Sequence, residues 1–122
     1  TGLMGIMNAA DIYNRIEALR VPKCRVLFAS TGVKGDEFRA SYYIDELLAA
    51  NSVNTAPIAT IDAYVKGGDT TLKLPLDAAV IKEHQQRVAD AGIVMETIIE
   101  QQITEGLEAF KGAFSEILSE LE

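Results

Sequence analysis

The sequence is poor in cysteine, in basic residues and in long apolar runs, and each shortage excludes a class of protein. The single cysteine, Cys24, cannot form an internal disulfide and has no second cysteine with which to bind a metal. No stretch reaches the ~20 apolar residues of a membrane-spanning helix, and the residues after Thr1 do not resemble a signal peptide. We therefore expect a cytoplasmic protein with no membrane partner and no bound metal.

The shortage of basic residues also argues against nucleic acid as a partner. Eleven Lys and Arg residues stand against 18 Asp and Glu residues, for a net charge of −7, whereas phosphate backbones are bound by an excess of clustered basic side chains. Between Arg15 and Arg39, however, basic residues outnumber acidic ones. This local excess favours a small anionic ligand. An uneven surface charge without any ligand explains it equally well.

Helical and strand-like segments alternate along the first half of the chain, which is the pattern of an α/β protein. The continuous apolar run from Val26 to Ala29 predicts a strand buried on both faces, as in a parallel sheet covered by helices. Gly67 and Gly68 predict a helix end with left-handed backbone. The expected elements are a helix over 3–20, a strand over about 25–30, a helix over 39–50, a strand over 53–56 and a helix over 58–66.

The rest of the chain predicts a helical extension over about 77–122. Asp77 is the expected N-cap of a helix that Gly92 ends, while the stretch before Asp77, over 70–76, fits a strand or a loop. Beyond Gly106, apolar residues recur at steps of three and four, so the last helix carries an apolar stripe that must pack on its own domain or on a coiled-coil partner. The stripe consists of Leu107, Phe110, Phe114, Ile117 and Leu121.

Two buried strands cannot close a sheet by themselves. A barrel of alternating strands and helices needs eight such units and about 250 residues, and this chain has 122. We therefore expect the chain to be part of a larger α/β protein.

The loop after the first strand combines residue types that bind phosphate. Ser30 and Thr31 offer hydroxyl groups, Gly32 and Gly35 let backbone N–H groups approach a ligand, and Lys34 adds a positive charge. In barrel enzymes phosphate commonly sits at the loops after the seventh and eighth strands. Ser-Thr-Gly turns are also common without a ligand, so a purely structural loop is the alternative.

Other chemically capable residues are better explained by structure. His84 has no neighbouring ligand for a metal and is expected on a solvated helix face. Asp45 and Glu46 are adjacent, so they point to different helix faces and are expected to act through the helix dipole. Asn54 and Thr55, polar residues in a short strand, must hydrogen-bond in the core or line a polar site.

Three ordered blocks of sequence resemble the late motifs of bacterial transaldolases. They are Ala29-Ser30-Thr31-Gly32-Val33-Lys34, Tyr43-Ile44-Asp45-Glu46-Leu47, and Val53-Asn54-Thr55-Ala56-Pro57 with the following Ala59-Thr60-Ile61-Asp62-Ala63. The resemblance extends from the helix that contains Gly5 to Ala10 through to the acidic C-terminal helix, and it is weakest over 68–92.

The resemblance implies that the chain is the C-terminal part of a (β/α)8 TIM barrel with a C-terminal helical extension. The strands over 25–30 and 53–56 would be the seventh and eighth of the barrel. In the family, a lysine on an earlier strand forms a Schiff base with a ketose phosphate, without a cofactor, and a dihydroxyacetone unit passes to an aldose phosphate in the pentose phosphate pathway. That lysine would precede Thr1, so the chain itself would contain no catalytic residue and would be inactive alone.

The phosphate-binding serine of the family aligns with Ser30. One branch of the family has an arginine two residues later, where this chain has Gly32, and Lys34 is the expected substitute. A lysine is a point charge rather than a bidentate fork, so its contact with the phosphate would differ. The resemblance implies a sugar phosphate as ligand and, as partner, the missing N-terminal part of the barrel or a second copy. A non-catalytic phosphate-binding or assembly module, or another Schiff-base aldolase of the same superfamily, remains open.

Overall fold

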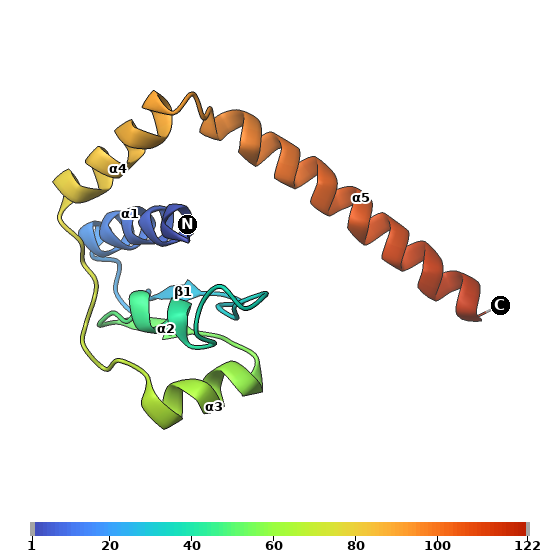
Figure 1. The fold of residues 1–122 in the computed structure, drawn as a ribbon, viewed down its shortest axis with the longest axis horizontal. Helices are drawn as coiled ribbons and strands as arrows, with labels where there is room; N and C mark the ends of the chain where they lie inside the picture. Colours follow the sequence, from blue (N-terminus) through green and yellow to red (C-terminus); the bar gives the residue numbers. More distant parts are fainter. Residues whose placement is uncertain (1, 122) are drawn as a thin grey trace. The chain divides into compact units, whose positions relative to one another are not determined.

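The computed structural model describes residues 2–121 and divides the chain into two units, residues 1–84 and 85–122. The first unit is a mixed α/β structure whose two short strands form a parallel sheet (Figure 1). In chain order, the elements are α1 (Leu3–Leu19), β1 (Val26–Phe28), α2 (Tyr42–Glu46), β2 (Ser52–Asn54), α3 (Ile58–Gly67), α4 (Ala78–Asp90) and α5 (Met95–Leu121).

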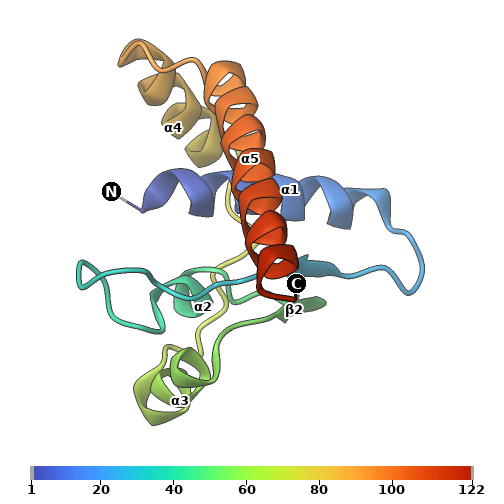
Figure 2. The same cartoon turned by 90° about the vertical axis from the view of Figure 1, so that its right-hand side faces the viewer.

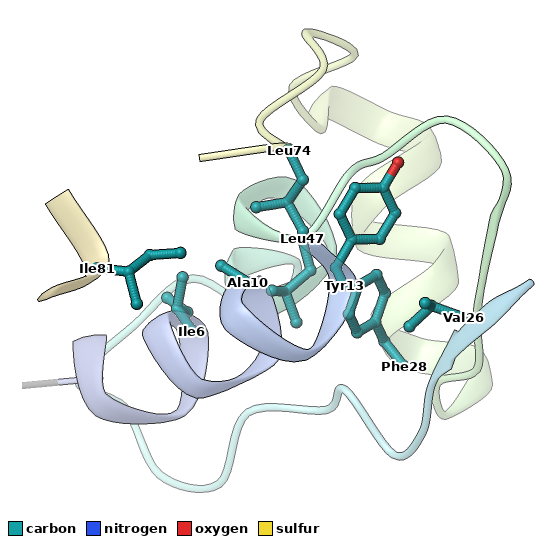
Figure 3. Close-up of a cluster of buried hydrophobic side chains, with 8 residues drawn as sticks. All are labelled: Ile6, Ala10, Tyr13, Val26, Phe28, Leu47, Leu74 and Ile81. Carbon is teal, nitrogen blue, oxygen red and sulfur yellow. The ribbon is translucent and has the colours of Figure 1, made fainter. Parts of the chain in front are cut away.

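The core of the first unit lies between α1 and one face of the sheet. α1 buries Ile6, Ala10 and Tyr13, residues spaced by four and three, as the helical period requires. Figure 3 shows the Tyr13 ring beside that of Phe28, with ring centroids 6.3 Å apart. The core is completed by Val26, also on β1, and by side chains from three further segments, namely Leu47, Leu74 and Ile81. The expected helix over 3–20 is therefore confirmed, and its apolar face covers the sheet.

Both expected strands form and are parallel neighbours, although the second, predicted over 53–56, spans only 52–54. The prediction that the first strand is buried on both faces was wrong. Val26 pairs with Ser52 and Phe28 with Asn54. Val26 and Phe28 are buried against α1, whereas Leu27, which points to the opposite face, is 54% exposed. Among the described residues no element covers that second face. The sheet therefore presents an apolar side chain to solvent where a further layer would normally pack.

The second helix is shorter than the expected 39–50, because its last turn is replaced by bonds to a distant segment. α2 ends at Glu46, and the carbonyl of Leu48 accepts hydrogen bonds from the backbone N–H groups of Lys73 at 2.8 Å and Leu74 at 3.3 Å. Ala49 and Leu74 also form an isolated parallel bridge. The stretch over 70–76, which fitted a strand or a loop, is thus a loop with a single strand-like contact.

α3 has nearly the predicted bounds, but its C-terminal glycine does not have the predicted conformation. Gly68 is extended, with φ −69° and ψ 156°, rather than left-handed. The aromatic ring of Tyr64 lies where a side chain at position 68 would begin. Glycine is needed here for the close approach of that ring, not for a positive φ.

α4 begins and ends at the predicted signals. The Asp77 carboxylate accepts a hydrogen bond of 2.8 Å from the backbone N–H of Ala79, and Gly92, just beyond the helix, has φ 78°. The first turns of α4 belong to the first unit, where Ile81 packs against the core beside Ile6 (Figure 3).

The second unit contains the end of α4 and the long helix α5, drawn in orange to red in Figures 1 and 2. α5 is one continuous helix, although the sequence placed a boundary at Gly106. Glycine costs roughly 1 kcal/mol relative to alanine in a helix interior, too little to break a helix of this length. Within its own unit α5 buries no residue, and the apolar stripe of Leu107, Phe110, Phe114, Ile117 and Leu121 is exposed.

Candidate phosphate site

Two loops meet at the carboxyl ends of β1 and β2. Beyond the strands, the N–H of Thr55 donates to the carbonyl of Phe28 at 3.0 Å, and the N–H of Thr31 donates to the carbonyl of Thr55 at 3.0 Å. The parallel pairing therefore continues past both strand ends. As a result, the loop that follows β1 and the loop that follows β2 are held side by side.

Ser30 and Thr31 are held in place by hydrogen bonds between these two loops. The buried Thr31 hydroxyl donates to the carbonyl of Thr55 at 3.0 Å, so Thr31 has a structural role. Ser30 has a left-handed backbone with φ 58°, and its N–H donates to the Thr55 hydroxyl at 3.3 Å. A positive φ is uncommon for serine and persists where surrounding bonds enforce it. The turn leaves Ser30 exposed to solvent.

Gly32 allows the two loops to approach each other closely. A Cβ atom at this position would lie 3.0 Å from both Cδ and Cγ of Pro57 and 3.6 Å from the hydroxyl oxygen of Thr60. Ordinary carbon contacts are about 3.5–4.0 Å. A side chain at position 32 would therefore push the loops apart.

The two loops enclose an open pocket of about 430 Å³. Its lining residues are Ser30, Gly32, Val33, Lys34, Thr55, Ala56 and Pro57. The structure thus places Ser30 and Lys34, the two residues predicted to bind phosphate, on one pocket. Thr55 and Pro57 of the second loop complete it. Thr55 and Pro57 reach the pocket because of the register between the two strands, and the sequence pattern alone does not predict that register.

The pocket is rich in hydrogen-bond donors. Lys34 is exposed and, among residues 2–121, its ammonium has no ion-pair partner. Within the same described range, the backbone N–H groups of Gly32, Val33 and Lys34 donate to no protein acceptor. Consecutive free N–H groups beside a hydroxyl and an ammonium can bind the oxygens of an anion.

A second, smaller hollow of about 340 Å³ shares Gly32, Val33 and Lys34 with the first pocket. Its aromatic wall includes Phe38 and Tyr43, and Phe38 stacks on Tyr42 with ring centroids 4.5 Å apart. Burial raises the pKa of Tyr42 above its usual 10.0, and the neighbouring Glu46 carboxylate raises it further. The remaining lining residues are Gly2, Gly32, Val33, Lys34 and Glu37. Glu37 makes this hollow less suited to an anion than the first pocket.

Asp45, expected to act through the helix dipole, lies in the first turn of α2 but also forms a network that the sequence did not predict. Its side chain is completely buried. One carboxylate oxygen accepts a hydrogen bond from the Ser41 hydroxyl at 2.8 Å and forms an ion pair with the Arg39 guanidinium at 3.0 Å. The other oxygen accepts the N–H of Asp69 at 2.6 Å. Ser41 lies four residues before Asp45, and this spacing is the one local signal for the network. The contact with Asp69 spans 24 positions.

Asp69 continues the network toward solvent. Its carboxylate pairs with the Lys73 ammonium at 2.7 Å and accepts the N–H of Thr71 at 2.8 Å. These bonds hold the pKa of Asp69 well below its usual 3.8, and the bond from Lys73 contributes most. The pairing with Asp69 in turn raises the pKa of Lys73.

Two other sequence candidates lie away from the pocket. Asn54 pairs with Phe28, so its side chain points to the α1 face of the sheet, where its Oδ1 is buried without a hydrogen-bond partner among the described residues. His84 is half-buried, which corrects the expected solvated position, and within the described range its Nε2 has no partner either. Over the same residues, no group of three His, Cys, Asp or Glu side chains is arranged to hold a metal ion.

In the part of the chain that the structure describes, none of the helices has the length and apolar character required to cross a membrane.

The fold and the pocket define an α/β protein with a donor-rich site at the carboxyl ends of two parallel strands. Comparison with known proteins identifies one family. The family model described as transaldolase/fructose-6-phosphate aldolase matches residues 1–121. A transaldolase of Campylobacter jejuni (strain 81-176) is 42% identical over 119 residues, which cover 97% of this chain and 35% of that protein. A transaldolase of Helicobacter pylori (strain HPAG1) is 36% identical over 115 residues, covering 94% of this chain and 36% of that protein.

The chain therefore belongs to the transaldolase/fructose-6-phosphate aldolase family. It spans about a third of the length of the curated relatives it matches, 35% of the Campylobacter protein and 36% of the Helicobacter protein.

Proposed function

We propose that this chain is the C-terminal part of a transaldolase and that its pocket binds the phosphate of a sugar phosphate. The observation that carries the proposal is the pocket itself, which Ser30 and Lys34 line together with Gly32 and Val33. Among the described residues, the backbone N–H groups of residues 32–34 have no protein acceptor. Phosphate oxygens accept several short charge-assisted hydrogen bonds at once, which suits a site that offers mainly donors.

The first unit also has the features of a barrel segment. α1 covers one face of the sheet, while Leu27 and its neighbour Val53 lie on the other. In a (β/α)8 barrel helices cover the outer face, and the inward side chains fill the barrel together with those of the other strands. β1 and β2 would then be the seventh and eighth strands, the usual position of a phosphate site in this fold.

The proposed reaction divides the work between this chain and the remainder of the enzyme. A lysine of an earlier strand would form a Schiff base with a ketose phosphate, and a dihydroxyacetone unit would pass to an aldose phosphate, as in the pentose phosphate pathway. Neither β1 nor β2 contains a lysine. This chain would therefore hold the phosphate end of the substrate and supply no catalytic residue and no cofactor site.

The proposed partner of the open faces is the remainder of the barrel, in a cytoplasmic enzyme. Leu27 is exposed on the sheet, and α3 exposes Ile58 and Val65, which are 78% and 77% accessible. Apolar patches of this kind are rarely left open in a soluble monomer. In the absence of the remainder, we expect the chain to associate with itself.

Steady-state kinetics of the full-length enzyme that carries this sequence test the phosphate assignment. A charge-assisted hydrogen bond is worth about 1.5–3 kcal/mol, so Lys34→Ala should lower kcat/KM for a phosphorylated substrate by roughly ten- to a hundredfold. Ser30→Ala removes a neutral donor worth about 0.5–1.5 kcal/mol and should cost less. Lys66→Ala, which removes an exposed lysine on α3, is the matched control and should behave as wild type.

The unphosphorylated substrate is the decisive comparison. Its kcat/KM should change little in Lys34→Ala, because the Schiff-base chemistry is untouched. If Lys34→Ala has no effect, or impairs both substrates equally, then the loop is structural and the assignment is wrong. Cleavage of the ketose phosphate without an acceptor aldose would instead identify a related Schiff-base aldolase.

A further inference from the structure

Asp45 is a buried ionisable group that takes no part in the proposed binding of phosphate. Its carboxylate is fully inaccessible, pairs with Arg39, and accepts hydrogen bonds from Ser41, just before it, and from Asp69, in the loop after α3. Burying a carboxylate costs several kcal/mol unless it is well bonded, and well-packed apolar residues often stabilise a fold as much. Net stability therefore does not by itself account for the residue.

The position of Asp45 relates it to the phosphate loop. The loop over residues 29–41 carries Lys34 and is tied at one end by Thr31, whose N–H and hydroxyl both donate to the carbonyl of Thr55. At its other end, Arg39 and Ser41 are tied to Asp45. Lys34 lies between these two anchors and, among residues 2–121, makes no ion pair of its own. The anchors therefore set where its ammonium can lie.

The Asp69 contact makes the second anchor rigid. The N–H of Asp69 lies 2.6 Å from the free oxygen of Asp45, and the Asp69 carboxylate is itself held by Lys73 and Thr71. The carboxylate of Asp45 thus joins the end of the phosphate loop to a second loop that is braced independently. Aromatic stacking of Phe38 on Tyr42 supports the same end of the loop, but with no directional bond.

We propose that Asp45 is a positioning residue for phosphate recognition: it holds the second end of the loop so that Lys34 and the free N–H groups face the phosphate pocket. This inference rests on the proposed function of that pocket. When the anchor is lost, the loop samples other conformations, and the apparent affinity falls in proportion to the fraction of molecules that remain competent. A fall of that fraction to between a third and a tenth raises the apparent KM about three- to tenfold.

Two variants test the proposal in the full-length enzyme that carries this sequence. Asp45→Asn keeps the shape of the side chain and removes its charge, and Ser41→Ala removes one bond without any change of charge. Both should raise KM for the phosphorylated substrate and the inhibition constant of inorganic phosphate, by about three- to tenfold for Asp45→Asn and less for Ser41→Ala. In both variants kcat should stay within about twofold of wild type, as should kcat/KM for the unphosphorylated substrate.

Asp11→Asn is the matched control. It makes the same chemical change on α1, where Asp11 pairs with Arg15 at 2.9 Å on the surface. It should leave both substrates unaffected. Should Asp45→Asn fail to fold, Ser41→Ala decides the matter alone, because it preserves the ion pair between the buried Asp45 and the half-exposed Arg39.

A double-mutant cycle separates positioning from a general structural role. If Asp45 acts through the phosphate loop, Ser41→Ala should raise KM by a clearly smaller factor once Lys34→Ala is present, because only the backbone N–H groups then remain to be positioned. Additive effects, an equal loss for both substrates, or no effect of Asp45→Asn and Ser41→Ala would overturn the inference while Lys34→Ala still weakens phosphate binding. No effect of Lys34→Ala would instead refute the proposed function, and the inference with it.

Discussion

Replacing Gly32 with alanine probes the junction between the two loops of the pocket. The backbone at Gly32 does not have a positive φ, so alanine can adopt its conformation. The obstacle is contact, because the added Cβ would lie 3.0 Å from two carbons of the Pro57 ring. The ring is rigid and occupies the N-cap position of α3, so relief requires a shift of either the loop or the helix start.

Two opposing terms set the size of the effect. Overpacking by one methyl group costs about 1–3 kcal/mol. Alanine also lowers the conformational entropy of the unfolded chain, which stabilises the folded state by about 0.4–1 kcal/mol and partly offsets this cost. We therefore expect Gly32→Ala to lower the free energy of unfolding by roughly 1–2 kcal/mol. It should also weaken phosphate binding, because the moved backbone carries the N–H groups of the pocket.

Urea unfolding of the full-length enzyme that carries this sequence, monitored by circular dichroism, measures the change in the free energy of unfolding. The midpoint should shift while the m-value stays the same. Gly5→Ala is the control, because a Cβ at this helical position would meet nothing within 4 Å. It should stabilise by about 0.5–1 kcal/mol. If Gly32→Ala proved as stable as Gly5→Ala and bound phosphate normally, the close contact between the loops would not constrain the site.

Three further outcomes are expected. Tyr13→Phe removes the 2.7 Å bond from the Tyr13 hydroxyl to the carbonyl of Ala50, and should lower the free energy of unfolding by about 0.5–1.5 kcal/mol in urea titrations; no change would mean that water replaces the bond fully. Because the folded-state pKa of Asp69 is lowered, its contribution to stability is present above pH 3.8 and is lost as the pH falls further. Carboxyl NMR should find Asp69 still ionised below pH 3.8 in wild type, and its pKa should be higher in Lys73→Met, where only the bonds from Thr71 remain. Borohydride with a ketose phosphate should leave no stable adduct on the isolated chain. An adduct on any of its lysines would contradict the proposal that the Schiff-base lysine belongs to the remainder of the enzyme.

Local signals predicted much of the first unit. The spacing of Ile6 and Tyr13 marks the buried face of α1, and Asp77 and Gly92 mark the limits of α4, because each depends on residues within one or two turns. The parallel pairing of the two strands followed from the alternation of helices and apolar runs. These features need no knowledge of distant contacts.

The errors have long-range causes. Leu27 is exposed because the face of the sheet opposite α1 lacks a covering layer, and α2 stops early because Leu48 bonds to Lys73 and Leu74. Asp45 is buried because Asp69, 24 positions away, donates to it. None of these contacts leaves a periodic signal in the sequence.

The candidate site also combines features with a local sequence signal and features that depend on long-range contacts. The composition of one loop identified Ser30 and Lys34, and the structure places both on one pocket. The contribution of Pro57 and the free N–H groups of residues 32–34 became visible only with the strand register and the hydrogen-bond pattern.

The most direct measurement is a crystal structure of the full-length enzyme that carries this sequence, with a ketose phosphate trapped as its reduced Schiff base. The account predicts phosphate oxygens within about 2.7–3.0 Å of the Ser30 hydroxyl and the Lys34 ammonium, in the pocket between the loops that follow β1 and β2. A phosphate bound at other residues, with this pocket left to solvent, would contradict it.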